Sequence, residues 1–171
     1  MKTRKAIFSA FRTLLEKKKY DHITVGDIIE AADVGRSTFY SHFETKDALL
    51  EAMCGEIFHH VFGNDPCPWQ DKGDTLDVKL AHTLWHVRES RTDLTGVLLS
   101  DGGELFMTYF KKHLAALYEE HIEEFDTSLP REFLLNHLAS STCEAVKWWV
   151  SRKFKETPEK LAEYILKVLK K

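Results

Sequence analysis

The fold of this chain is decided by residues 24–49, which read TVGDIIEAADVGRSTFYSHFETKDAL. Thr24 and Asp27 have the spacing of a capping box, so we expect a short helix to begin after Thr24. Residues 33–35 then predict a tight turn, in which Gly35 either takes a positive φ or serves as the N-cap of the next helix. The stretch therefore predicts two short helices joined by a tight turn.

The second of these helices is predicted over residues 36–43 and has two unlike faces. Phe39 and Phe43 lie one turn apart, so both rings point inward on a helix. The outward face is small, polar and aromatic, and it consists of Arg36, Ser37, Tyr40 and Ser41. This helix therefore separates a packing face from a solvent face.

The rest of the chain also shows the apolar periodicity of helices and no strand pattern. All four prolines fall in loops or at helix starts, with Pro130 and Pro158 at or next to the first helical position. We therefore predict an all-α fold of about nine helices. Besides the short helix after Thr24, the predicted helices cover about residues 4–19, 36–43, 45–63, 75–90, 92–99, 103–125, 130–153 and 158–170.

Charge is distributed unevenly along the chain, although the net charge is only -3. Residues 1–20 carry seven basic side chains and one acidic side chain, whereas residues 54–171 carry 15 basic and 19 acidic ones. Attraction to a polyanion depends on the local electrostatic field and not on the total charge. Any nucleic-acid surface is therefore expected near the N-terminus.

The composition excludes several classes of protein. With 171 residues and 43% hydrophobic content, the chain can bury a core, which excludes a disordered tail. No apolar run approaches the roughly 18 residues of a membrane span. No signal-peptide hydrophobic region follows the first residues, so we expect a cytoplasmic location without membrane contact. The three widely spaced cysteines fit a reducing compartment.

Two short helices joined by a tight turn, braced by a basic first helix, are typical of a helix-turn-helix. The second helix of that motif enters the major groove of duplex DNA, which is roughly 12 Å wide. Bland helical hairpins are also common, and in that alternative the three helices only pack a core. Spacing by itself leaves both interpretations open.

The residues themselves resemble a known family. Residues 24–29 and 31–49, with Ser37-Thr38-Phe39-Tyr40, His42-Phe43 and Lys46 among them, closely resemble the N-terminal domain of the TetR family of bacterial transcriptional regulators. The resemblance covers about residues 3–53. It implies an all-α homodimer with a three-helix DNA-binding domain at residues 1–47 and a helical effector-binding and dimerisation domain at residues 48–171.

The resemblance also implies roles for individual residues. Base-facing positions fall on Arg36, Ser37 and Tyr40, and positions at the phosphate backbone fall on Thr24, Thr38, Ser41, His42 and Lys46. Their chemistry agrees, because arginine forms a bidentate pair with guanine, while hydroxyl and ammonium groups suit phosphate oxygens. The chain departs from the family pattern at Gly35, where a capping serine is usual, and at Gly26, where a longer polar side chain often reaches DNA.

A homodimer is expected because one reader helix touches only a few base pairs, so two half-sites of a palindromic operator are needed. The last two predicted helices carry wide apolar stripes suited to a four-helix interface. The candidate interface residues are Leu138, Val146, Trp149, Val150, Leu161, Ile165 and Leu169. The alternative is that these stripes only pack inside one chain.

The helices of residues 75–125 are expected to bind a small-molecule effector that releases the protein from DNA, so that the protein acts as a repressor. The candidate effector residues are Trp85, Phe106, Tyr109 and Phe110. Aromatic stripes at helical spacing are more often packing than a pocket. A regulator controlled by a partner protein, or one without an effector that acts as an activator, is the alternative.

Metal and enzyme chemistry find little support in the sequence. His82 and His86 are four residues apart on one predicted helix, and His59, His60, Cys54 and Cys67 lie near the loop at residues 63–73. No HExxH or CxxC pattern completes a site, so metal response is a remote alternative, and we expect no metal site and no cofactor. No GxSxG, P-loop or Rossmann fingerprint occurs, so we expect no enzyme.

Overall fold

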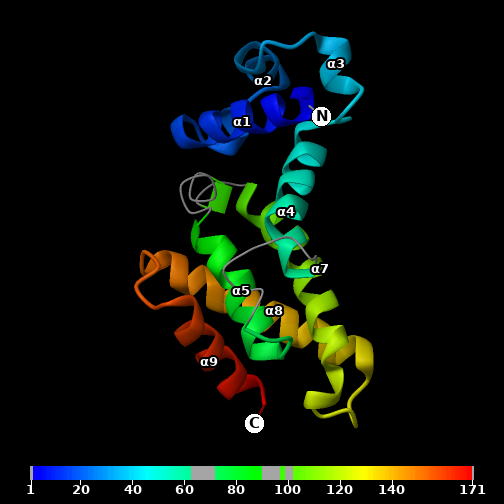
Figure 1. The fold of residues 1–171 in the computed structure, drawn as a ribbon, viewed down its shortest axis with the longest axis vertical. Coiled ribbons are helices and arrows are strands. Elements are labelled where there is room, and N and C mark those ends of the chain that lie inside the picture. The colour runs from blue at the N-terminus through cyan, green and yellow to red at the C-terminus, as the bar shows by residue number, and fades with distance from the viewer. Residues whose placement is uncertain (1, 63–71, 90–96, 99–101, 171) are drawn as a thin grey trace. The chain divides into compact units, whose positions relative to one another are not determined.

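The computed structural model describes residues 2–62, 72–89, 97–98 and 102–170, with the side chains of residues 57–62 left out. No described residue lies in a strand, and none of the described helices is long and apolar enough to cross a membrane. The described α-helices (Figure 1) are α1 (Lys2–Lys17), α2 (Val25–Ala32), α3 (Arg36–Tyr40), α4 (Lys46–Phe62), α5 (Leu76–Glu89), α7 (Gly102–Glu120), α8 (Arg131–Ser151) and α9 (Pro158–Leu169). Two 3-10 helices, Tyr20–His22 and Ile122–Glu124, complete the described elements.

The chain divides into two compact units. The first comprises Met1–Ile57 and Ser90–Met107, and the second comprises Phe58–Glu89 and Thr108–Lys171. Two helices contribute to both units, because the division falls inside α4 and inside α7. The first unit is therefore larger than the domain expected at residues 1–47, since it also takes in most of α4 and the first part of α7, up to Met107.

The first unit is built on α1, which packs against α2. The buried side chains Ile7, Phe8, Phe11 and Leu15 form the apolar face of α1 that the periodicity predicts. Phe39 and Phe43 are also buried, and the edge of one of the Phe8 and Phe43 rings meets the face of the other, with centroids 5.5 Å apart. The inward orientation expected for both phenylalanines is therefore confirmed.

The main helix boundaries agree with the sequence, with two differences. The helix expected over residues 36–43 ends at Tyr40, and Ser41 closes it by donating its hydroxyl to the Thr38 carbonyl at 2.8 Å. The helix expected over residues 103–125 ends at Glu120 and is followed by a separate 3-10 turn. Most of the helix expected over residues 92–99 lies outside the described residues.

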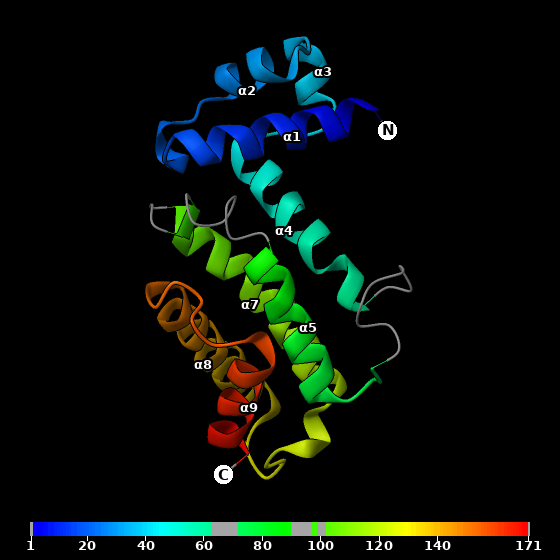
Figure 2. The ribbon, with the colours of Figure 1, turned by 60° about the vertical axis from the view of Figure 1, so that its left-hand side comes forward.

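The second unit is organised by α9, which packs against both α5 and α8 (Figures 1 and 2). Thr157 caps α9 by accepting a hydrogen bond from the backbone N–H of Lys160, and Pro158 stands in the first turn, where no N–H donor is needed. The buried face of this helix consists of Pro158, Leu161, Ala162, Ile165 and Leu166. These contacts are local to the second unit.

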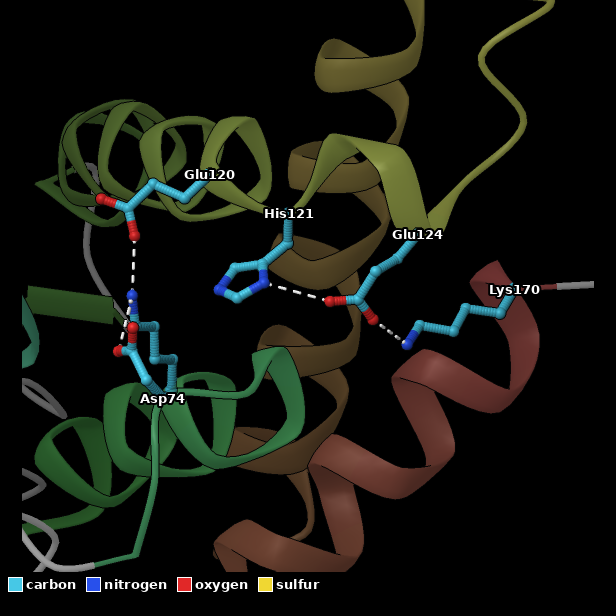
Figure 3. Close-up of polar contacts among 6 residues, drawn as sticks. Asp74, Glu120, His121, Glu124 and Lys170 are labelled. Carbon is cyan, nitrogen blue, oxygen red and sulfur yellow. Dashed lines mark hydrogen bonds and ion pairs between the residues drawn. The ribbon is translucent and has the colours of Figure 1, made fainter.

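Ion pairs and hydrogen bonds between charged side chains connect the start of α5 with the end of α7, and the residues after α7 with the end of α9 (Figure 3). Lys79 of α5 pairs with Asp74 at 3.0 Å and with Glu120 at the end of α7 at 2.8 Å. Glu124 accepts hydrogen bonds from His121 and from Lys170, which follows α9. The hydrogen bond from the Lys170 ammonium is the main reason that the pKa of the Glu124 carboxyl is lowered.

One hydrogen bond lies wholly inside this core. The Tyr118 hydroxyl meets the Thr142 hydroxyl at 2.6 Å, and both residues have no exposed surface. Thr142 donates its own proton to the Leu138 carbonyl at 3.0 Å, so Tyr118 is the donor in the pair. Burial raises the pKa of Tyr118 to about 12. The phenol therefore stays protonated and can keep donating.

Replacing either partner of this hydrogen bond is expected to have unequal effects. Thr142→Val keeps the side-chain size but leaves a buried Tyr118 hydroxyl without a partner, which costs about 1–3 kcal/mol of the free energy of unfolding. Tyr118→Phe leaves Thr142 still donating to Leu138 and costs about 0.5–1.5 kcal/mol. Urea unfolding followed by circular dichroism measures both. A Tyr118→Phe protein less stable than Thr142→Val contradicts the assigned donor.

Candidate nucleic-acid interface

The capping box predicted at the start of α2 is present. Thr24 accepts a hydrogen bond from the Asp27 backbone N–H at 3.1 Å, and the Asp27 carboxylate accepts one from the Thr24 backbone at 2.8 Å. The hydrogen bond from the Thr24 backbone N–H lowers the pKa of Asp27 to about 2, with a smaller contribution from the hydrogen bond that Lys18 donates. Thr24 is exposed, and its hydroxyl donates its proton to the Asp27 carboxylate at 2.9 Å. That proton is therefore not available to a phosphate unless this hydrogen bond breaks.

The tight turn expected between α2 and α3 is present, and the structure decides between the two roles left open for Gly35. Asp33, at the C-cap of α2, takes the left-handed conformation with φ 50°, and its N–H returns to the Glu30 and Ile29 carbonyls. Gly35 has φ -73° and acts as the N-cap of α3. Of the two roles open to Gly35, the structure selects the cap, and an aspartate supplies the positive φ.

The solvent face of α3 carries the residues expected to read DNA bases. Arg36, Ser37 and Tyr40 are exposed, with 46% of Tyr40 accessible. The Tyr40 and Phe39 rings meet edge to face with centroids 5.5 Å apart, which fixes the direction of the phenol. The structure therefore brings the three base-facing candidates together on one exposed turn and a half of helix.

The residues expected at the phosphate backbone lie around this face. Ser41 and His42 are exposed in the turn after α3, and Thr38 is half-buried. Lys46, at the start of α4, is half-buried because its ammonium donates to the Tyr20 carbonyl at 2.8 Å and lies 4.0 Å from the Tyr20 ring centroid. An ammonium has three donors, so donors remain for a phosphate oxygen.

Tyr20 is the residue that sequence reasoning missed. It lies between α1 and α2, where a connecting segment is normally exposed, yet only 4% of its surface is accessible. Its hydroxyl donates to the Asp47 carboxylate, and its ring meets Phe11 edge to face. In the sequence, Tyr20 is only a single aromatic residue directly after the lysines at 17–19. Nothing in that pattern indicates which residues it contacts.

The expected dimer residues divide into two groups. Three are buried in the second unit and face its core: Leu138, Val146 and Trp149. Leu161, Ile165 and Leu169 line a groove of about 280 Å³ between α8 and α9, and the first two of them are also buried. Val150 is half-buried. The large exposed apolar side chains of these two helices are instead Phe133, Trp148, Tyr164 and Val168.

The four expected effector residues differ in burial and in the unit to which they belong. Phe106 and Phe110 are fully buried, whereas Trp85 and Tyr109 are half-buried. Phe106 belongs to the first unit and the other three to the second. The α8–α9 groove and a second groove of about 550 Å³ between α5 and α9 are lined by other residues. The effector site stays a prediction.

The histidines weighed as metal ligands form a pair and no larger group in the part of the chain that the structure describes. The Nε2 atoms of His82 and His86 lie 2.9 Å apart. Cys54 is buried, and burial raises the pKa of its thiol. Cys67 and the side chains of His59 and His60 lie outside the described residues.

Two family models match the chain and together cover most of its length. The model described as "Bacterial regulatory proteins, tetR family" matches residues 7–53, which include α2 and α3. The model described as "Transcriptional regulator C-terminal region", of the same family, matches residues 74–171. Both units of the structure are therefore represented.

Solved structures show the same fold. A TetR transcriptional regulator from Streptococcus agalactiae 2603V is 37% identical, with a TM-score of 0.77 over 99% of this chain and 94% of that one. The dihydroxyacetone kinase operon activator DhaS is 22% identical and matches with a TM-score of 0.66 over 98% of this chain and 93% of that one. The second likeness concerns the fold alone.

Curated relatives match over shorter stretches. The HTH-type regulator YxbF of Bacillus subtilis is 39% identical over 66 residues, which are 36% of this chain and 17% of YxbF. The dhaKLM operon activator DhaS of Lactococcus lactis is 32% identical over 72 residues, 41% of this chain and 38% of DhaS. The chain thus spans well under half the length of these relatives.

The C-terminal family model alone covers more than half of the chain, and the N-terminal model covers the helix-turn-helix. Members of this family are DNA-binding regulators and not enzymes. This chain belongs to the TetR family of bacterial transcriptional regulators.

Proposed function

We propose that this chain binds a palindromic operator in double-stranded DNA as a homodimer, with α3 of each copy in a major groove. The observation that carries the proposal is the exposed face of Arg36, Ser37 and Tyr40 above the buried rings of Phe39 and Phe43. A short helix anchored by two rings presents polar groups in one fixed direction, as a groove reader requires.

Arg36 is the proposed base reader. It is exposed at the first position of α3, and the structure gives its guanidinium no hydrogen bond or ion pair with any described residue. A guanidinium forms two parallel hydrogen bonds with O6 and N7 of guanine in the major groove. Ser37 and Tyr40 are proposed to contact bases beside it, Tyr40 through a thymine methyl group or a nearby phosphate.

Lys46 is the proposed main phosphate contact. Ser41 and Thr24 already donate their hydroxyl protons to Thr38 and Asp27, so in phosphate binding their protons must change partner. The Lys46 ammonium carries a full charge and has donors left beyond the one used by Tyr20. His42 and Thr38 are proposed as weaker contacts beside it.

A second copy is proposed to cover the outer face of α8 and α9. Trp148 is 44%, Tyr164 42% and Val168 74% exposed, and all three line the 280 Å³ groove between these helices. Apolar side chains gathered beside a groove mark an interaction surface. Two readers on one molecule also supply the two half-sites that specific recognition in a genome requires.

Control by a small-molecule effector and repression are the finer parts of the proposal. The helices α5 and α7 carry the candidate effector residues Trp85, Tyr109 and Phe110, and half-burial of the first two leaves them surface for a ligand. Activation is the second candidate, because DhaS, which shares sequence with residues of this chain, is named an activator. We place the protein in the cytoplasm, where bacterial DNA lies.

Arg36→Ala is expected to relax base preference at one position of each half-site. Loss of a bidentate pair costs about 1–3 kcal/mol of discrimination against the wrong base. The measurement compares affinities for the operator, found by genomic footprinting, and for operators changed at single positions. Arg131→Ala, an exposed arginine of the second unit, is the control. Equal losses on operator and unrelated duplex contradict base reading.

Lys46→Ala is expected to weaken binding to every duplex alike. When one phosphate contact is lost, binding releases fewer counterions from the DNA, so the slope of log affinity against log salt concentration becomes shallower by about 0.9. Fluorescence anisotropy on operator and mixed-sequence duplexes over a range of salt concentrations measures the slope. Lys155→Ala removes an exposed lysine of the second unit and serves as the control. An unchanged slope refutes the phosphate contact.

Val168→Glu is expected to convert the dimer to single chains, because a carboxylate placed in an apolar interface loses its hydration without a partner. Sedimentation equilibrium measures the mass of each protein in solution. Lys167→Glu places the same carboxylate on the neighbouring residue of α9, which lines the α5–α9 groove, and is expected to remain dimeric. A dimer that survives Val168→Glu places the interface elsewhere.

A further inference from the structure

The first turn of α7 packs directly on Tyr20, within the first unit. Gly102 is the first residue of α7 and is buried. A Cβ atom at Gly102 would lie 2.6 Å from Cδ1, 2.7 Å from Cγ and 2.9 Å from Cβ of Tyr20. Rotation of the side chain can move Cγ and Cδ1 away, but the Tyr20 Cβ atom moves only together with the backbone, and the ring is displaced in either case. The close approach therefore depends on a residue without a side chain.

The same tyrosine holds the ammonium group of Lys46. Its carbonyl accepts a hydrogen bond from Lys46 Nζ at 2.8 Å, and its ring centroid lies 4.0 Å from that nitrogen. Its hydroxyl donates to Asp47, the next residue of α4. Tyr20 thus contacts both residues that open α4 and also the residue that opens α7.

The contacts with Tyr20 matter for binding, because the side chain of Lys46 is a flexible four-carbon chain that loses much conformational entropy when its ammonium is fixed. A hydrogen bond and a ring face that fix the ammonium before DNA arrives remove part of that cost from binding. The position of the Tyr20 ring then determines where the charge is presented. A shift of the ring displaces the charge from the path of a phosphate.

We propose that Tyr20 is a positioning residue for the contact of Lys46 with DNA phosphate, and that Gly102 sets the position of Tyr20. The inference rests on the proposed phosphate contact of Lys46. Gly102 opens the part of α7 that belongs to the first unit, which ends at Met107, so it lies in the same unit as Tyr20 and Lys46.

The test is a double-mutant cycle of Gly102→Ala and Lys46→Ala, measured on a labelled duplex of mixed sequence. No operator is needed, because phosphate contacts do not depend on base sequence. Gly55→Ala is the matched control, since it adds the same methyl group in α4 with no atom within 4 Å. Thermal melting followed by circular dichroism shows that each protein is folded.

Gly102→Ala is expected to lower affinity several-fold and to make the salt slope shallower by up to about 0.9, the value of one phosphate contact. In the Lys46→Ala background it is expected to change neither quantity, because the contact is already absent. Gly55→Ala leaves both as in the unmodified protein. A Gly102→Ala effect that is absent, or that persists in full without Lys46, overturns the inference.

Tyr20→Leu decides the matter if Gly102→Ala does not fold. Leucine keeps an apolar side chain beside Gly102 and removes the aromatic face next to the ammonium. We expect weaker DNA binding and a shallower salt slope when Lys46 is present, and no change when it is alanine. An unchanged Tyr20→Leu protein overturns the inference. If Lys46→Ala alone leaves the slope unchanged, the proposed phosphate contact itself fails, which is a separate result.

Discussion

The contact between the Lys46 ammonium and Tyr20 joins two segments of the first unit that are far apart in the sequence. It joins the segment after α1 to the start of α4, and the Tyr20 hydroxyl reinforces the same junction through Asp47. The interaction between a cation and an aromatic ring is stronger in a partly buried position than in open water. The junction also leaves part of the charge available, so one lysine both closes the fold and faces the expected path of DNA.

The helix α3 is short, and a cluster of aromatic rings packed beneath it supplies stability that its own backbone hydrogen bonds cannot. Five residues form too few backbone hydrogen bonds to be stable alone. Phe39 packs against Phe43, and Phe43 packs against Phe8. The Arg4 guanidinium lies 5.2 Å and 5.3 Å from the Phe8 and Phe43 ring centroids. Some of the N-terminal positive charge thus supports the fold of the reader rather than attracting DNA.

In the second unit, α8 and α9 each have an inner and an outer apolar face. Trp149 is fully buried and donates its indole N–H to the Glu156 carbonyl at 2.9 Å, whereas its neighbour Trp148 is 44% exposed. The inner faces complete the core with α5, and the outer faces leave the groove proposed for a second copy. The proposed dimer would therefore add to a finished core and would not replace it.

The sequence by itself determined the all-α fold and the helix-turn-helix, because apolar periodicity and the capping box at Thr24 are properties of neighbouring residues. It also identified the exposed face around Arg36. Only the tertiary structure decided that α3 stops at Tyr40, which apolar faces of α8 and α9 turn inward, and that Tyr20 holds Lys46 beside Gly102. Those outcomes depend on contacts between residues far apart in the chain, and local patterns carry no information about which distant partners will meet.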